Sequence, residues 1–144
     1  MQLFGIGIDV VEVDRIAAAI ERHGNSFLMK LFTGGERAYC ESHPKPAVHY
    51  AARFAAKEAI SKALGTGIGG QAGWLDLEIV RTATGAPKLL LHGHAAEFAR
   101  QNGIVEVQIS LTHARDYAAA NAVAIWDGLD ARAPIQKDAL GAAI

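Results

Sequence analysis

The spacing of apolar and polar residues predicts one strand followed by several helices in the first part of the chain. The apolar segment over residues 3–8 contains two glycines and is typical of a buried strand. Apolar residues then recur at nearly helical spacing over 10–22, and Gly24 marks the expected end of that helix. Thr33 and Glu36 have the spacing of a capping box, in which each side chain accepts a hydrogen bond from the other residue's backbone N–H. Another short helix is therefore expected to begin there.

A longer helix is predicted from about Ala47 to Leu64. The two prolines of segment 43–46 make that segment a loop, and Gly65 stands where a glycine commonly ends a helix. Small side chains form a stripe along the helix: Ala52, Ala56, Ala59 and Ala63. Such a stripe allows the helix to lie close against a sheet.

The second half of the chain is predicted to be mostly β-structure. The turn-forming segment 84–87 joins two strand-like segments, which is the pattern of a hairpin. The predicted elements of this half are strands over 75–82, 88–91, 104–112 and 117–126 and a helix over 94–102. The order of elements predicts an α+β fold, in which helices pack on one face of a mostly antiparallel sheet.

The composition is that of a globular protein with one domain. The chain has 144 residues, which is an ordinary length for one domain, and 51% of them are hydrophobic, which is enough for a core. We expect residues 1–126 to form this domain. Residues 127–144 are rich in alanine, glycine and aspartate, and we interpret them as a C-terminal tail of unknown role.

Charge and cysteine content narrow the possible partners and the compartment. The formal net charge of -1 gives no general electrostatic reason to bind nucleic acid. Cys40 is the only cysteine, so no internal disulfide can form, which fits a reducing compartment. No segment approaches the ~20 apolar residues that span a bilayer, and the start lacks the basic region of a signal peptide. We therefore expect a cytoplasmic protein without a membrane or nucleic-acid partner.

The strongest candidate for chemistry is the predicted long helix together with the glycines after it. Arg53, Lys57, Glu58 and Lys62 lie on this helix, so cations and a carboxylate are close to a flexible backbone. This combination suits a phosphorylated ligand held together with a metal ion. The ordinary alternative is that Glu58 and Lys62 form a surface ion pair, because they are four residues apart in the favourable order.

The glycines at the end of this helix also allow two interpretations. Gly65, Gly67 and Gly70 match the spacing of a dinucleotide-binding fingerprint, but that fingerprint follows a strand and opens a helix. Here the glycines follow a helix, so we reject the fingerprint. They either end the helix or form a loop whose backbone approaches a ligand.

Two residues outside the helix are further candidates. Asp9 and Glu58 could be the two carboxylates of a Mg²⁺ site completed by waters and substrate phosphates, although spacing does not show that they meet. Asp9 with Glu12 is also an N-cap pattern. His113 follows a predicted strand and is either structural or able to bond a phosphate or relay a proton.

Three blocks of sequence resemble the holo-[acyl-carrier-protein] synthases, the small bacterial type of 4′-phosphopantetheinyl transferase. The blocks are Gly5-Ile6-Gly7-Ile8-Asp9 with Arg15-Ile16, Arg53-Phe54-Ala55-Ala56-Lys57-Glu58-Ala59 through Lys62-Ala63-Leu64-Gly65-Thr66-Gly67, and Ser110-Leu111-Thr112-His113 with Tyr117-Ala118. The resemblance covers residues 1 to about 126.

The resemblance implies an activity, a cofactor and an assembly. It implies transfer of phosphopantetheine from coenzyme A to a serine of apo acyl carrier protein, with release of adenosine 3′,5′-bisphosphate. It also implies the 4′-phosphopantetheinyl transferase fold, dependence on Mg²⁺, and a homotrimer with active sites between subunits. The carrier could serve fatty-acid synthesis, polyketide assembly or a larger synthase. A nucleotide or pyrophosphate hydrolase and a non-catalytic binding module remain as alternatives.

The resemblance also implies roles for individual residues. Asp9 and Glu58 would be the metal ligands, and Glu58, Lys62 and His113 the catalytic residues. The implied coenzyme A contacts are Arg53, Lys62, Gly65, Thr66, Gly67, Pro87 and His113. Glu58, a metal-bound water and His113 are all possible acceptors of the serine proton. Arg15 and Arg22 match part of the surface on which the family docks its acidic carrier, although acidic residues interrupt them here.

Overall fold

The structure, a computed structural model, describes residues 1–127, so the predicted tail lies outside the described residues apart from Asp127. Its elements are β1 (Gln2–Glu12), α1 (Val13–His23), α2 (Asn25–Leu31), α3 (Gly34–Glu41), α4 (Pro46–Leu64), the 3₁₀ turn η1 (Trp74–Asp76), β2 (Leu77–Arg81), β3 (Pro87–Leu91), α5 (Gly93–Gln101), β4 (Ile104–His113) and β5 (Tyr117–Trp126). The predicted α+β class is confirmed. No helix among residues 1–127 is long and apolar enough to cross a membrane.

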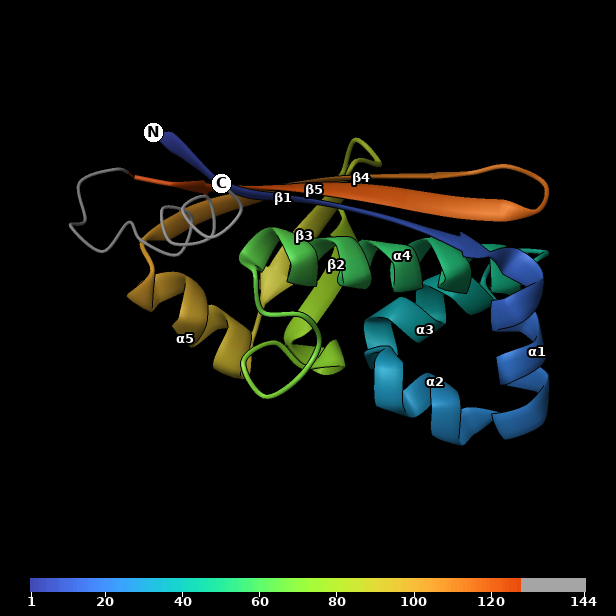
Figure 1. Ribbon diagram of the computed structural model, residues 1–144. Helices are drawn as coiled ribbons and strands as arrows, with labels where there is room; N and C mark the ends of the chain where they lie inside the picture. Colours follow the sequence, from blue (N-terminus) through green and yellow to red (C-terminus); the bar gives the residue numbers. More distant parts are fainter. Residues whose placement is uncertain (128–144) are drawn as a thin grey trace, which may run out of the picture.

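The strands form two antiparallel sheets rather than one. A three-stranded sheet has the order β1-β5-β4, and β2 pairs only with β3 in a separate hairpin. The strand β1 therefore lies at one edge of the larger sheet, next to β5, the last strand of the described residues. The helices lie on one side of this sheet, and α4 runs directly beneath it (Figure 1).

Helix α4 packs very close to β1 because two glycines of β1 face it. A Cβ atom at Gly7 would lie 1.9 Å from the carbonyl oxygen of Ala59, and one at Gly5 would lie 2.1 Å from that of Ala63. Both alanines are buried and belong to the predicted stripe of small side chains. The stripe on the helix is thus matched by glycines on the strand, which confirms that the helix lies directly on the sheet.

A buried ion pair joins α4 to the shorter elements below it. The Lys57 ammonium lies 2.8 Å from the Glu36 carboxylate, and both side chains are fully buried. Lys57 also donates to the backbone oxygens of Leu31 and Trp74, at 2.7 and 2.8 Å. Glu36 accepts from the backbone N–H of Ile79 at 3.0 Å. Every polar group of the pair is therefore hydrogen-bonded, as burial of charge requires, and α2, α3, η1 and β2 are tied to α4.

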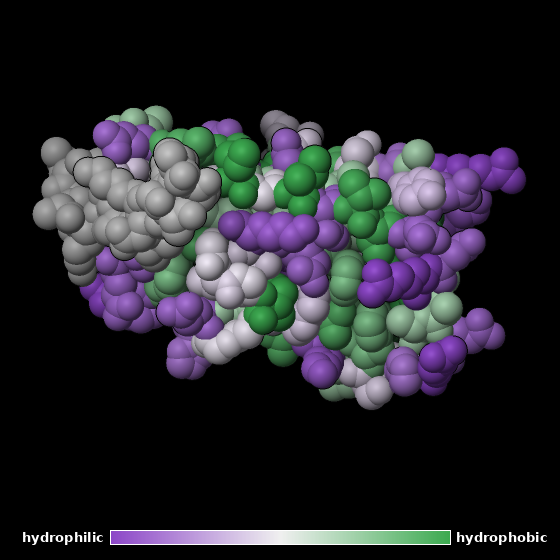
Figure 2. Space-filling view, in the orientation of Figure 1, coloured by the Kyte–Doolittle hydropathy of each residue, from purple (hydrophilic) through white to green (hydrophobic). Residues whose placement is uncertain are grey.

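The face of the larger sheet that points away from α4 is apolar along its edge strand. Ile6, Ile8 and Val10 alternate with the residues that face the helix, and they are 67%, 66% and 59% exposed. Figure 2 shows apolar side chains gathered along the border of the molecule where Figure 1 draws β1. Such a row leaves a contiguous apolar surface uncovered in the single chain.

The local signals for helix ends are confirmed. Thr33 and Glu36 form the predicted capping box, with bonds of 3.2 Å from the Glu36 N–H to the Thr33 hydroxyl and 2.9 Å from the Thr33 N–H to the Glu36 carboxylate. Gly65 ends α4 with a φ of 78°, in the left-handed region that favours glycine.

Two predicted boundaries are wrong. The helix predicted from residue 10 begins only at Val13, because β1 continues to Glu12 and pairs with β5 without a break from Gly5 to Glu12. Asp9 therefore lies within a strand, and the N-cap interpretation of Asp9 is wrong as well. The strand predicted from residue 75 begins at Leu77, because residues 74–76 form a 3₁₀ turn in which the Asp76 carboxylate accepts from the Gly73 N–H at 3.2 Å.

The contact between β1 and α4 yields a testable prediction for stability. Gly7→Ala is expected to lower the free energy of unfolding by about 1–3 kcal/mol, because the added Cβ has no room against the helix backbone. Urea unfolding measured by circular dichroism gives the difference. Gly70→Ala is the matched control, since a Cβ there meets nothing within 4 Å. Equal stability of the two variants would show that β1 and α4 are not in such close contact.

Candidate active site

The strand β1 presents Asp9 to helix α4. Asp9 is on the same side of the strand as Gly5 and Gly7, so its carboxylate meets the helix just beyond the close contact. The Lys62 ammonium lies 3.2 Å from the Asp9 carboxylate and donates to the Ile8 carbonyl at 2.9 Å. Lys62 therefore forms its ion pair with a residue of β1, rather than the surface pair with Glu58 that the helix spacing also allowed.

Glu58 belongs to the same group of charges. Burial raises the pKa of its carboxyl, and the negative charge of Asp9 raises that pKa further. The positive charges of Lys62 and Arg15 act in the opposite direction. Asp9 and Glu58, which are far apart in sequence, are thus close enough to repel one another, and both lie beside a lysine.

This donor set fits a Mg²⁺ ion shared with a phosphorylated ligand. Mg²⁺ in proteins is commonly held by one or two carboxylates together with waters and substrate phosphates. Within residues 1–127, no group of three or more His, Cys, Asp or Glu side chains could hold a metal ion. Asp9 and Glu58 can therefore supply part of a coordination shell, and the remainder must come from the ligand and water.

A second group of charged residues surrounds Tyr39 on α3. The guanidinium carbon of Arg53 lies 4.0 Å from the centre of the Tyr39 ring, and that of Arg81 lies 5.1 Å from the same centre. Arg53 is only 1% exposed, and its Nε is the one buried side-chain nitrogen or oxygen atom of residues 1–127 without a hydrogen-bond partner. A buried, unpaired guanidinium N–H is costly, so it calls for an anionic ligand or water.

A pocket of about 460 Å³ opens beside this group. Its lining includes Lys45, His49, His113 and Arg115. The imidazole rings of His49 and His113 have centres 5.6 Å apart. The pocket is therefore lined by cationic and imidazole side chains together with Pro44, Val48 and Ala114, and His113 is one of its lining residues.

The two groups lie on the same face of the larger sheet. Val11 pairs with Ala118, and Ala118 pairs in turn with His113. Asp9 is two residues before Val11, so Asp9 and His113 are separated by two strand spacings and two residues. With strands ~4.8 Å apart and ~3.4 Å per residue, their Cα atoms are roughly 12 Å apart. One extended ligand with several phosphates could reach both groups.

The other predicted contacts lie around these groups. The turn of Gly65, Thr66 and Gly67 begins three residues after Lys62, and both glycines have positive φ values, 78° and 64°. Pro87 pairs with Arg81 and so borders the group around Tyr39.

The two predicted docking residues have different surroundings. The positive charge of Arg15 is close enough to Glu58 to lower the pKa of its carboxyl, whereas Arg22 lies in the exposed last turn of α1.

Sequence reasoning missed four residues of the second group: Tyr39, His43, His49 and Arg81. His49 had one usable signal, because it lies four residues before Arg53 on the same helix and therefore on the same side. The other three come from α3, the loop after it and the hairpin, and nothing in their local sequence connects them to Arg53.

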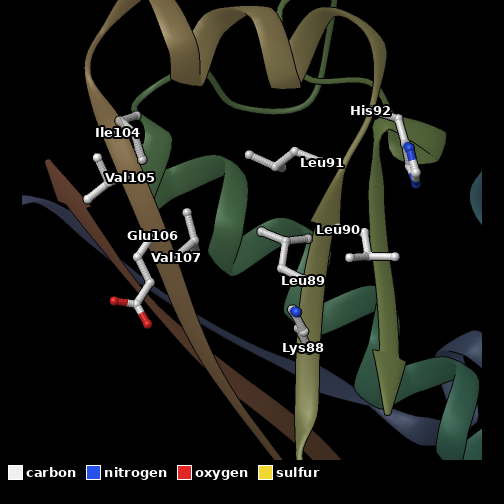
Figure 3. A pocket seen from close by; sticks show the side chains of 9 residues that line it. All are labelled: Lys88, Leu89, Leu90, Leu91, His92, Ile104, Val105, Glu106 and Val107. Atoms are coloured by element: carbon white, nitrogen blue, oxygen red, sulfur yellow. The ribbon is translucent and has the colours of Figure 1, made fainter. Parts of the chain in front are cut away.

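A second pocket of about 460 Å³ lies between β3 and β4, away from both groups. Figure 3 shows Leu89 and Leu91 of β3 pointing toward Ile104 and Val107 of β4, with Leu90 and His92 on the other side of β3. None of the predicted site residues lines it. It therefore contributes nothing to the candidate active site.

Comparison with known proteins shows the family and the fold of the chain. The sequence profile described as 4′-phosphopantetheinyl transferase superfamily matches residues 5–122. The holo-[acyl-carrier-protein] synthase of Solibacter usitatus is 47% identical over 111 residues, which are 77% of this chain and 89% of that protein. The crystal structure of holo-[acyl-carrier-protein] synthase from Neisseria meningitidis superposes on this chain with a TM-score of 0.81 and is 32% identical to it. The superposition covers 86% of this chain and 99% of the Neisseria chain.

A ligand-bound relative is similar as well. The Helicobacter pylori holo-[acyl-carrier-protein] synthase in complex with coenzyme A has a TM-score of 0.75 and 32% identity, and covers 83% of this chain and 99% of that chain. The fold and the sequence relationships thus define a phosphopantetheinyl transferase. The chain belongs to the 4′-phosphopantetheinyl transferase superfamily and, within it, to the family of holo-[acyl-carrier-protein] synthases.

The electrostatics of the carboxylate pair can be tested directly. Asp9→Asn is expected to lower the pKa of Glu58, because the variant removes the negative charge that raises it. A pH titration of the Glu58 side-chain carboxyl by NMR measures the change. Asp14→Asn, at an exposed position of α1, is the matched control. An unchanged pKa of Glu58 in Asp9→Asn would contradict the proximity of the two carboxylates.

Proposed function

We propose that this protein transfers the 4′-phosphopantetheine group from coenzyme A to a serine of an apo acyl carrier protein and releases adenosine 3′,5′-bisphosphate. The main support is the convergence of Asp9, Glu58 and Lys62 on the same sheet face as a pocket lined by His49 and His113. Arg53, whose buried Nε has no hydrogen-bond partner, lies near His49. The family relationship and the coenzyme A complex of a similar protein support the same reaction.

Asp9 and Glu58 are the residues that would hold a Mg²⁺ ion. When bound, the ion supplies positive charge to the diphosphate at which the bond breaks. Its binding would also relieve the repulsion that raises the pKa of Glu58. Lys62, which is half exposed and paired with Asp9, is free to turn its ammonium toward a phosphoryl oxygen. It would stabilise the negative charge that develops on that oxygen during transfer.

Arg53 and His113 are proposed to bind the phosphate monoester of coenzyme A. The unpaired Nε–H of Arg53 can donate to an anion without losing an existing bond. Stacking on Tyr39 holds the guanidinium in place before the ligand arrives. The turn of Gly65, Thr66 and Gly67 follows Lys62, so its backbone is close to where the diphosphate would lie.

The carrier protein is proposed to dock on α1 through Arg15 and Arg22. Acyl carrier proteins are acidic, so basic residues at the docking surface favour association. Helix α1 begins immediately after β1, and the charge of Arg15 already reaches Glu58. A carrier held at Arg15 would therefore bring its serine close to the metal ligands.

We further propose a homotrimer that acts in the cytoplasm. The row of Ile6, Ile8 and Val10 leaves an apolar sheet face uncovered, and association of copies would bury it. The single cysteine suits a reducing compartment, in which coenzyme A keeps its free thiol.

The transfer reaction gives the test of the function. Incubation with coenzyme A, Mg²⁺ and apo carrier protein is expected to add the mass of phosphopantetheine to the carrier, as measured by mass spectrometry. Glu58→Gln is expected to lower the rate by about 100-fold or more, since it removes a metal-binding charge while keeping the shape. Glu97→Gln, on the exposed side of α5, is the control. No mass gain with any carrier, or hydrolysis of coenzyme A without one, would contradict the proposal.

The assembly has a separate test. Ile8→Glu is expected to convert the trimer into smaller species, because it places a charge within the apolar face. Light scattering coupled to size-exclusion chromatography measures the mass. Met29→Glu, at a residue of α2 that is 57% exposed, is the matched control and should leave the trimer intact. A monomeric unmodified protein would contradict the homotrimer.

A further inference from the structure

Two histidines without a role in the proposed reaction, His43 and His49, lie among the cationic residues around Tyr39. The ring of His49 is 3.9 Å from that of His43 and 5.6 Å from that of His113, measured between centres. It also meets the edge of the Tyr39 ring at 5.8 Å. His49 lines the pocket together with His113, so a ligand in the pocket contacts its ring.

The charged groups that act most strongly on His49 are all basic. Those whose charge acts on it are His43 after α3, Arg53 on α4, Arg81 on β2 and His113 on β4. Lys45 and Arg115 complete the charged lining of the pocket. Burial and these positive charges lower the pKa of His49 from 6.5 to about 4. Without a bound anion, the His49 ring is therefore uncharged at neutral pH.

An anion in this pocket would reverse the electrostatic balance at His49. A phosphate monoester carries nearly two negative charges at neutral pH. It would offset the charges of Arg53 and Arg81 and would favour a protonated imidazole next to it. Ligand binding and protonation are thermodynamically linked, so a ligand that favours the protonated His49 ring must bind more tightly at lower pH.

We propose that the pocket binds a phosphate monoester dianion together with a proton taken up by His49, so that affinity for the phosphorylated donor rises as the pH falls through neutrality. This inference rests on the proposed function, because coenzyme A is the donor there and carries one phosphate monoester besides its diphosphate. In this proposal, His49 contacts the phosphate monoester of coenzyme A and takes up a proton when coenzyme A binds.

The sign of the effect follows from the two states of His49. The pKa of His49 is about 4 in the free protein and is expected to be higher in the complex. Affinity for the phosphate monoester therefore increases as the pH falls from the pKa of His49 in the complex to its pKa in the free protein. Where one proton is taken up per ligand, affinity changes by up to about tenfold per pH unit. The ligand phosphate itself gains a proton near pH ~6, so the range above that value isolates the contribution of His49.

Calorimetry of coenzyme A binding at pH 7 in buffers with different ionisation enthalpies counts the protons taken up. The wild-type protein is expected to take up a substantial fraction of one proton. His49→Phe, which keeps an aromatic ring against Tyr39 and His43, should lose most of this uptake. His94→Phe, on the exposed start of α5, is the matched control and should keep it. Dephospho-coenzyme A, which lacks the monoester, should bind without the uptake.

An NMR titration of the wild-type protein gives a second test that needs no variant to fold. The His49 ring should titrate near pH 4 when free and at a clearly higher pH with coenzyme A bound. This inference would be overturned if the wild-type protein bound coenzyme A without taking up a proton, or if His49→Phe took up as much as the wild-type protein. Either result would leave the proposed transferase function intact. Failure of the wild-type protein to bind coenzyme A or to modify any carrier would instead contradict the proposed function.

Discussion

The architecture depends on the close approach of α4 to β1. Gly5 and Gly7 allow the helix backbone to come within a distance at which any Cβ would collide with the carbonyls of Ala63 and Ala59. Asp9 is next on the same side of the strand, so it reaches Lys62 and the neighbourhood of Glu58. A wider spacing between strand and helix would leave these charges as separate surface groups without a shared ligand site.

Helix α4 carries both groups of site residues at fixed separation. Its first half bears His49 and Arg53, and its second half bears Glu58 and Lys62. Between them, the buried pair of Lys57 and Glu36 anchors the helix to the shorter elements. One group contains carboxylates that repel one another, and the other contains a guanidinium whose Nε–H has no hydrogen-bond partner. In the proposed function, a ligand that brings a cation and phosphates would relieve both, and the charges would already be arranged before it binds.

Local structure was predictable where the signal is local. The capping box of Thr33 and Glu36 and the end of α4 at Gly65 both depend on residues within a few positions, and both were found. The start of α1 was misplaced because pairing of β1 with β5, which comes more than a hundred residues later, extended the strand over residues that suit a helix equally well. Tertiary pairing overrode local preference there.

The sequence by itself determined the α+β class, most element positions, the family and the candidates Asp9, Glu58, Lys62 and His113. Only the tertiary structure decided that Lys62 pairs with Asp9 and that His49 lies near Arg53 and lines a pocket with His113. The physical reason is that these contacts link residues on different elements. Their distances depend on strand register and on the helix–sheet spacing set by two glycines, and neither is encoded by the spacing of residues along the chain.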